Sequence, residues 1–186
     1  MGSKKIIPHL FFLAVFCLPA CIETHYNLNE KGFIPYNLKK IASDKKVAVG
    51  KMSLDREFMN RMKGLVLSEG GFRDAVVKTL EGSGILASDN NEGDYELSGE
   101  GIVVLPSTVN GPFSNKCFFA VTYTLKSLDS NEVVWMERIY SETRERSAFG
   151  EPMSSGYTIC EEAVRENIAC LLERLEEKVF LDERND

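Results

Sequence analysis

The chain has 186 residues, with 28 acidic and 22 basic side chains, and its net charge at neutral pH is −6. An acidic chain without a basic stretch excludes nucleic acid as a partner, because affinity for phosphates comes from clustered Lys and Arg. The two histidines, His9 and His25, lie close to the N-terminus, so triads and zinc sites that need histidine are not expected in the rest of the chain. We therefore expect no catalytic residue, cofactor or metal.

The first 20 residues have the layout of a secretory signal peptide. Two lysines precede an apolar run over 10–16, which is shorter than the roughly 20 residues that span a membrane. The leader ends in LPA directly before Cys21, a pattern that resembles the lipobox of bacterial lipoproteins. The resemblance implies cleavage between Ala20 and Cys21 and a lipid such as palmitate on Cys21. Because Ile22 follows rather than aspartate, it also implies the outer membrane, facing the periplasm. The alternative is an ordinary signal peptide that is cut elsewhere.

Residues 21–44 mix glycine, proline, asparagine and charge without a sustained period. We expect a tether between the lipid and the folded domain, part of which can dock through Phe33, Ile34 and Tyr36. A single domain is expected over 45–181, followed by a frayed tail at 182–186.

Alternating and helical periods predict the elements of this domain. The expected strands cover 46–52, 95–105, 117–128 and 133–144. The expected helices cover 54–67, 68–81 and 157–179. Ser68 is the expected N-cap of the second helix, and Gly82 or Gly84 supplies its C-terminal stop. The start of the last strand, 133–136, is expected to be buried.

The two main helices, 68–81 and 157–179, give the order β-α-β-β-β-α. This order predicts a two-layer α+β sandwich, in which both helices cover one face of a mainly antiparallel sheet of about four strands. The helix between the first two strands allows them to pair in parallel.

Several short patterns resemble those of small uncharacterised lipoproteins of the bacterial envelope. They are GFRDAVVKTLEGSGIL at 71–86, GDYEL at 93–97, VTYTL at 121–125, VVW at 133–135 and AVRENIACLL at 163–172. Together they resemble the YajG and CsgG-like group over residues 45–178. The resemblance implies an envelope lipoprotein and brings no catalytic residues with it.

Three cysteines remain after the leader is removed and Cys21 is acylated, an odd number for an oxidising compartment. They are Cys117, Cys160 and Cys170. Buried free thiols that pack as small apolar groups are the favoured interpretation. A Cys117–Cys160 bridge is the alternative, which the sequence cannot decide.

Two polar groups lie beside the apolar stripes of the helices: Arg73 on one helix, and the trio Arg165, Glu166 and Asn167 on the other. Ordinary ion pairing along and between helices is the favoured interpretation. The alternative is a polar recognition spot where the helices meet the sheet. Similarly, the aromatic residues of the last two strands are expected in the core rather than in a ligand platform. These aromatic residues are Phe118, Phe119, Trp135 and Tyr140.

The sequence thus favours a non-enzymatic, lipid-anchored domain that faces the periplasm. Its expected partners are the membrane, through Cys21, and an envelope protein of an assembly or transport system. The alternative is a carrier or chaperone of an apolar ligand, with a pocket between sheet and helices.

Overall fold

The computed structural model describes residues 26–27, 30–55, 65–89, 92–104, 114–146 and 156–180. The strands are β1 (Tyr26–Asn27), β2 (Val47–Leu54), β3 (Leu65–Val66), β4 (Tyr95–Val104), β5 (Ser114–Ser127) and β6 (Val133–Arg146). The helices are α1 (Glu30–Phe33), α3 (Glu69–Ser83) and α4 (Gly156–Leu175), which continues as a π-helical turn over Glu176–Phe180. None of the described helices is long and apolar enough to cross a membrane.

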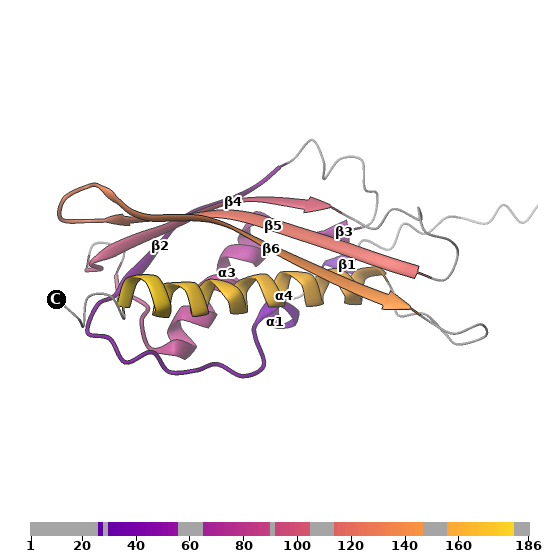
Figure 1. The fold of residues 1–186 in the computed structure, drawn as a ribbon, viewed down its shortest axis with the longest axis horizontal. Coiled ribbons are helices and arrows are strands. Elements are labelled where there is room, and N and C mark those ends of the chain that lie inside the picture. The colour runs from indigo at the N-terminus through magenta and orange to yellow at the C-terminus, as the bar shows by residue number, and fades with distance from the viewer. Residues whose placement is uncertain are drawn as a thin grey trace, which may run out of the picture.

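The main sheet has four strands in the order β2-β4-β5-β6. β2 and β4 are parallel, with α3 in the connection between them, and the β4–β5 and β5–β6 pairs are antiparallel. α3 packs against β2, and α4 packs against β5 and β6. Both helices lie on the same side of the sheet (Figure 1). The predicted α+β architecture and its β-α-β-β-β-α order are therefore confirmed.

Local capping groups set the ends of α3. The Ser68 hydroxyl accepts a hydrogen bond from the backbone N–H of Gly71 at 2.9 Å, which satisfies one of the free amides of the first turn. Gly84 has a φ of 81°, and its N–H donates to the carbonyl of Glu81. A side chain is strained at this φ, so glycine suits the stop. Both predicted caps of α3 are confirmed.

The core fills the space between the helices and one face of the sheet. Alternate residues of β4 and β5 point into it, and the ring of Phe72 on α3 meets that of Phe119 on β5 edge to face, with centroids 5.4 Å apart. Large side chains that are almost fully buried come from every layer. They include Phe33, Phe72, Leu80, Leu97, Phe119, Tyr123, Leu125, Ile168, Leu171 and Leu175. Such close packing is typical of a solid protein interior.

A disulfide joins the two layers. Cys117 on β5 and Cys160 on α4 are both buried, their Cα atoms are 5.2 Å apart, and they are bonded to each other. Cys170 is free and half-buried. The expectation of three free thiols was therefore wrong for Cys117 and Cys160, because the fold brings together two positions that are 43 residues apart in sequence.

Part of the expected tether packs on the helices. Phe33 and Ile41 are buried in the core, α1 contacts both α3 and α4, and the N–H of Ile41 donates to the carbonyl of Ser83. We call residues 32–41 the N-terminal strap. The docking expected of Phe33 is thus observed, whereas Tyr36 is largely exposed. Leader residues 1–20, Cys21 and tail residues 182–186 lie outside the described part of the chain.

Two local expectations were wrong, the first of them only at its ends. The range 54–67 was expected to be helical, but Leu54 ends β2 and Leu65–Val66 forms β3, which pairs in parallel with β1. The rest of that expectation falls on residues 56–64, which lie outside the described part. The start of β6 was expected to be buried, but Val133, Val134 and Met136 are exposed. The reason is that β6 is the last strand of the sheet and α4 covers only one of its faces.

Candidate functional site: the open face of the sheet

One face of the sheet is covered by α3 and α4, and none of the described elements covers the other, which we call the open face (Figure 1). On β5 and β6 the even-numbered residues point to this face, because their odd-numbered neighbours face the helices. The register places Glu100 of β4 beside Thr122 of β5, and Thr122 beside Arg138 of β6. Polar and charged side chains thus form a row across three strands.

This row lines a hollow of about 380 Å³. Its polar lining consists of Ser53, Asp55, Glu100, Thr122 and Arg138, with Leu54, Gly101 and Ile102 between them. Two carboxylates and one guanidinium give the hollow both signs of charge. Such a surface can hold a polar segment of a protein by hydrogen bonds and ion pairs.

Apolar side chains border the hollow on β6. Met136 is 61% exposed and Tyr140 is 68% exposed. The guanidinium of Arg138 lies over the Tyr140 ring, 5.2 Å from its centroid, as in a cation–π contact. Exposed aromatic and Met side chains next to Arg have the composition of protein–protein contact surfaces. The aromatic residue Tyr140, expected in the core, lies on this surface instead.

The structure places Arg73 at the edge of the sheet, away from the open-face hollow. Its guanidinium donates to the carbonyls of Val49 at 2.9 Å and Gly50 at 3.4 Å. The pairing of β2 with β4 shifts register between Val49 and Met52, so these carbonyls lie at an irregular point of the strand. Arg73 therefore ties α3 to the bulge in β2.

Arg165 holds the N-terminal strap against α4. It is 7% exposed, pairs with Glu162 and donates to the carbonyl of Gly32. The guanidinium carbon also lies 4.1 Å from the centroid of the Tyr36 ring. A buried arginine with these contacts fastens two segments that are far apart in sequence.

Asn167 lies fully buried between α4 and the sheet. Its side-chain oxygen accepts from the Tyr123 hydroxyl at 2.9 Å, and its amide donates to the carbonyls of Ile139 at 3.0 Å and Phe119 at 3.4 Å. Burial raises the pKa of Tyr123 well above its usual value, so the hydroxyl keeps its proton and remains a donor. The network fixes α4 on β5 and β6.

Glu166, the neighbour of Asn167, is exposed. Partial burial and the nearby Glu162 raise its pKa, while Thr143 and Arg165 oppose that change. The structure therefore does not gather the four residues into one patch: Arg73 faces β2, Arg165 the strap, Asn167 the core and Glu166 the solvent. Arg165 forms an ion pair with Glu162 along its helix, as the ion-pairing interpretation expects. Arg73 and Asn167 instead bind backbone carbonyls of the sheet. The polar recognition spot stays a prediction.

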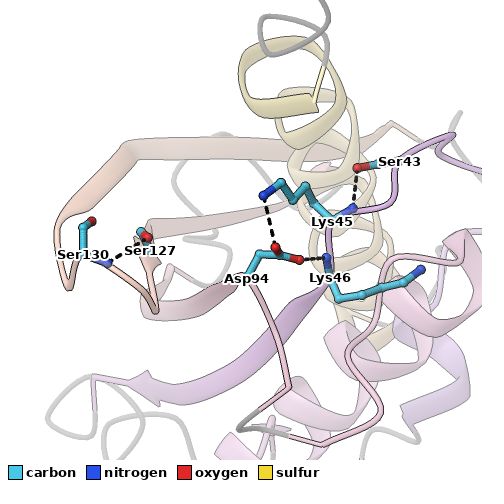
Figure 2. Close-up of polar contacts among 6 residues, drawn as sticks. All are labelled: Ser43, Lys45, Lys46, Asp94, Ser127 and Ser130. Atoms are coloured by element: carbon cyan, nitrogen blue, oxygen red, sulfur yellow. Dashed lines mark hydrogen bonds and ion pairs between the residues drawn. The ribbon is translucent and has the colours of Figure 1, made fainter.

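A further polar cluster, which the sequence analysis missed, closes the end of the sheet where β2 and β4 begin (Figure 2). The carboxylate of Asp94 accepts from the backbone N–H of Lys46 at 2.8 Å and from the Lys45 ammonium at 3.1 Å. Although burial alone would raise the pKa of Asp94, these donors lower it overall. The signal in the sequence was the pair of lysines directly before β2, Lys45 and Lys46, together with Asp94 directly before the neighbouring strand β4. Among the described residues, no group of three or more His, Cys, Asp or Glu side chains could hold a metal ion.

Comparison with known proteins reveals a shared fold. No family model matches the sequence, and no curated protein matches it. The structure is similar to protein XCC0632 from Xanthomonas campestris, described by the family model DUF330, with a TM-score of 0.57, 15% identity and coverage of 82% of this chain and 95% of that one. It is also similar to the hypothetical protein CT253 from Chlamydia trachomatis, with a TM-score of 0.51, 11% identity and coverage of 74% and 98%.

A looser likeness connects the chain to a PelC dodecamer from Paraburkholderia phytofirmans, with a TM-score of 0.47, 19% identity and coverage of 75% and 94%; we base no argument on it. At these identities the likenesses show the fold alone. Membership of the YajG and CsgG-like group stays a prediction.

Proposed function

We propose that this chain is a lipid-anchored, non-enzymatic interaction domain that faces the periplasm and serves an assembly or transport system of the cell envelope. The observation that carries the proposal is the open face of the sheet, where Met136 and Tyr140 are exposed beside a charged hollow. A face of mixed apolar and charged side chains loses little by being exposed and gains by binding a protein of matching shape and charge. The partner is therefore an envelope protein that covers this face.

The lipid on Cys21 gives the proposal its location. Between Cys21 and Tyr26, where β1 begins and pairs with β3, a segment of about five residues can extend at most roughly 18 Å. The strap then fixes the domain through Phe33 and Arg165. A domain held this close to a membrane, most simply the outer one, is well placed to present one face to a membrane-bound partner. The palmitate, the outer membrane and the periplasmic side rest on the lipobox resemblance.

The alternative, a carrier of an apolar ligand, finds less support. It needs an apolar cavity between sheet and helices, and large buried side chains such as Phe72, Phe119 and Tyr123 occupy that space. A second hollow, of about 120 Å³, lies between the strap and α4, and Lys39, Glu173 and Glu176 are part of its lining. Its size is well below that of a typical ligand pocket.

Site-specific photo-crosslinking in the native cells tests the proposal. A photoreactive amino acid at Thr122, in the hollow, should give a discrete adduct with one envelope protein, which mass spectrometry then identifies. The matched control is Glu81, an exposed residue of α3 on the helix side. Absence of an adduct at Thr122, or the same adducts from both positions, would contradict the proposed open-face partner. A co-purified lipid in place of a protein would favour the carrier.

A further inference from the structure

β6 leaves a long edge of the sheet without a partner strand in the described part of the chain. It runs for 14 residues, pairs with β5 on one side, and ends the strand order. An edge strand presents backbone N–H and C=O groups to any strand that can align with it, so proteins usually shorten, cover or charge such edges. β6 exposes Val133, Val134, Met136 and Tyr140, and its sequence also carries charges of both signs over 137–146. Such charges disfavour a strand whose charges do not match, but they permit pairing with a strand whose charges do.

We propose that β6 pairs in an antiparallel sense with β6 of a second copy of this chain. In this pair Tyr140 faces the partner's Tyr140 across a two-fold axis. A closed pair of identical chains uses the same patch on both subunits. Residues that face each other across an antiparallel pair point to the same side of the sheet. In a symmetric pair of identical strands, one residue must therefore face its own copy, and the axis passes between these two copies. The middle of β6 lies between Ile139 and Tyr140. If either of these residues faces its own copy, nearly the whole of β6 is therefore paired with the partner's β6.

Charge selects Tyr140 over the neighbouring centres. With the axis at Tyr140, Arg138 of each subunit lies opposite Glu142 of the partner subunit, which makes two pairs of opposite charge on the open face. An axis at Ile139 would place Glu142 opposite the partner's Met136, and an axis at Arg138 would place two arginines opposite each other. Only the register at Tyr140 matches both charges.

The helix layer is compatible with the same axis. α4 runs antiparallel to β6, because the Ser141 hydroxyl donates to the carbonyl of Ala163 at 2.6 Å and the Asn167 amide donates to the carbonyl of Ile139 at 3.0 Å. The part of α4 level with Tyr140 therefore lies between Ala163 and Asn167.

Strands are spaced about 4.8 Å apart, and α4 packs on both β5 and β6, so the axes of α4 and its copy would be about 10 Å apart. This matches the spacing of packed helices.

This pairing goes beyond the proposed function and does not depend on it. It joins two four-stranded sheets edge to edge, so the open faces of both subunits form one continuous surface. A failure of the dimer would leave the open-face partner of the single chain intact, and a failure to find that partner would leave the dimer intact.

Native mass spectrometry of the full chain, extracted from membranes in mild detergent, tests the pairing. We expect twice the mass of one chain, and Arg138→Glu or Glu142→Arg alone should weaken association at least about tenfold, because each creates two like-charge pairs. The double variant Arg138→Glu/Glu142→Arg restores the opposite charges and should restore the dimer. A monomer at every concentration, or single variants that associate like the wild type, would overturn the proposal.

Crosslinking fixes the register. In a Cys170→Ser background, Tyr140→Cys should form a disulfide between subunits, since facing residues of an antiparallel pair have Cα atoms about 4.5–5.5 Å apart, within disulfide range. The control, Met136→Cys, lies on the same face of the same strand and has similar exposure. Its copies would be eight residues apart along the strands, about 27 Å. Equal crosslinking of both variants, or none of Tyr140→Cys, would contradict an axis at Tyr140.

Discussion

Tyr123 and Asn167 form a buried hydrogen bond of 2.9 Å that links the middle of the sheet to the middle of α4. Both side chains are fully buried, and the Asn167 amide also donates to carbonyls of β5 and β6. A buried polar network of this kind stabilises one relative position of helix and sheet, because any other position leaves polar groups without partners. Asn167, one of the four residues of the predicted recognition spot, thus has a structural role.

Asn167→Ala should lower the free energy of unfolding by about 2–3 kcal/mol, since it leaves the buried Tyr123 hydroxyl without its acceptor and removes the hydrogen bonds to two carbonyls. Tyr123→Phe should cost less, about 1–2 kcal/mol. Because both changes break the same bond, the double variant should lose less than the sum of the two. Urea unfolding of the four proteins measures this coupling, and strictly additive losses would show that the bond contributes nothing.

The disulfide between Cys117 and Cys160 closes a loop of 43 residues. Replacing both cysteines by alanine should lower stability by about 3–4 kcal/mol, mainly because the unfolded chain regains freedom. Cys170→Ala, the control, should change stability by less than about 1 kcal/mol. Denatured but unreduced protein should bind a thiol reagent at Cys170 but not at Cys117 or Cys160. Reaction at either of the latter would contradict the bridge.

Arg165→Lys should loosen the N-terminal strap. Lysine keeps the charge but cannot donate to Gly32 and Glu162 in the same geometry or stack as a plane on Tyr36. Amide hydrogen exchange over 33–41 should therefore become faster, while exchange in β4 and β5 stays unchanged. Arg174→Lys is the matched control, because Arg174 lies on the same helix and its ion pairs are exposed. Unchanged exchange in the strap of the Arg165 variant would refute its clamping role.

Asp94 makes stability depend on acid pH. Its pKa in the folded chain is lower than the ordinary value of 3.8, despite burial, because Lys46 N–H and Lys45 favour the carboxylate. The stability it contributes is therefore complete above the unfolded pKa and is lost as pH falls through the lower, folded one. Asp94→Asn should cost about 1 kcal/mol at pH 7. The difference from the wild type should shrink as the pH falls below the ordinary pKa of 3.8, and a difference that stays constant there would contradict the assignment.

Features set by neighbours in sequence could be predicted from the sequence. Ser68 and Gly84 cap α3 through bonds within the same turn, and the three-to-four-residue stripe of α4 reflects one continuous buried face. The alternation in β5 identified its buried side for the same reason. Such signals depend only on local geometry, so they led to the correct order of elements.

Features that depend on where a strand lies in the sheet could not be predicted. Val133 and Met136 have the composition of a buried strand, and only the position of β6 at the edge explains their exposure. Likewise, the partners of Arg73 are backbone carbonyls of a distant strand, which no residue type reveals. An open face follows from placing both helices on one side of the sheet, but the row of Glu100, Thr122 and Arg138 depends on strand register, which the sequence does not show.

The claim on which the account rests most is the lipid anchor at Cys21, since it locates the domain and its partner. The direct measurement is the mass of the N-terminal peptide of protein purified from its native membranes. We predict a peptide that begins with Cys21 and carries acyl chains, and we predict that Cys21→Ser abolishes both the lipid and the cleavage before residue 21. An unmodified Cys21, or a mature chain that begins at another residue, would contradict the account.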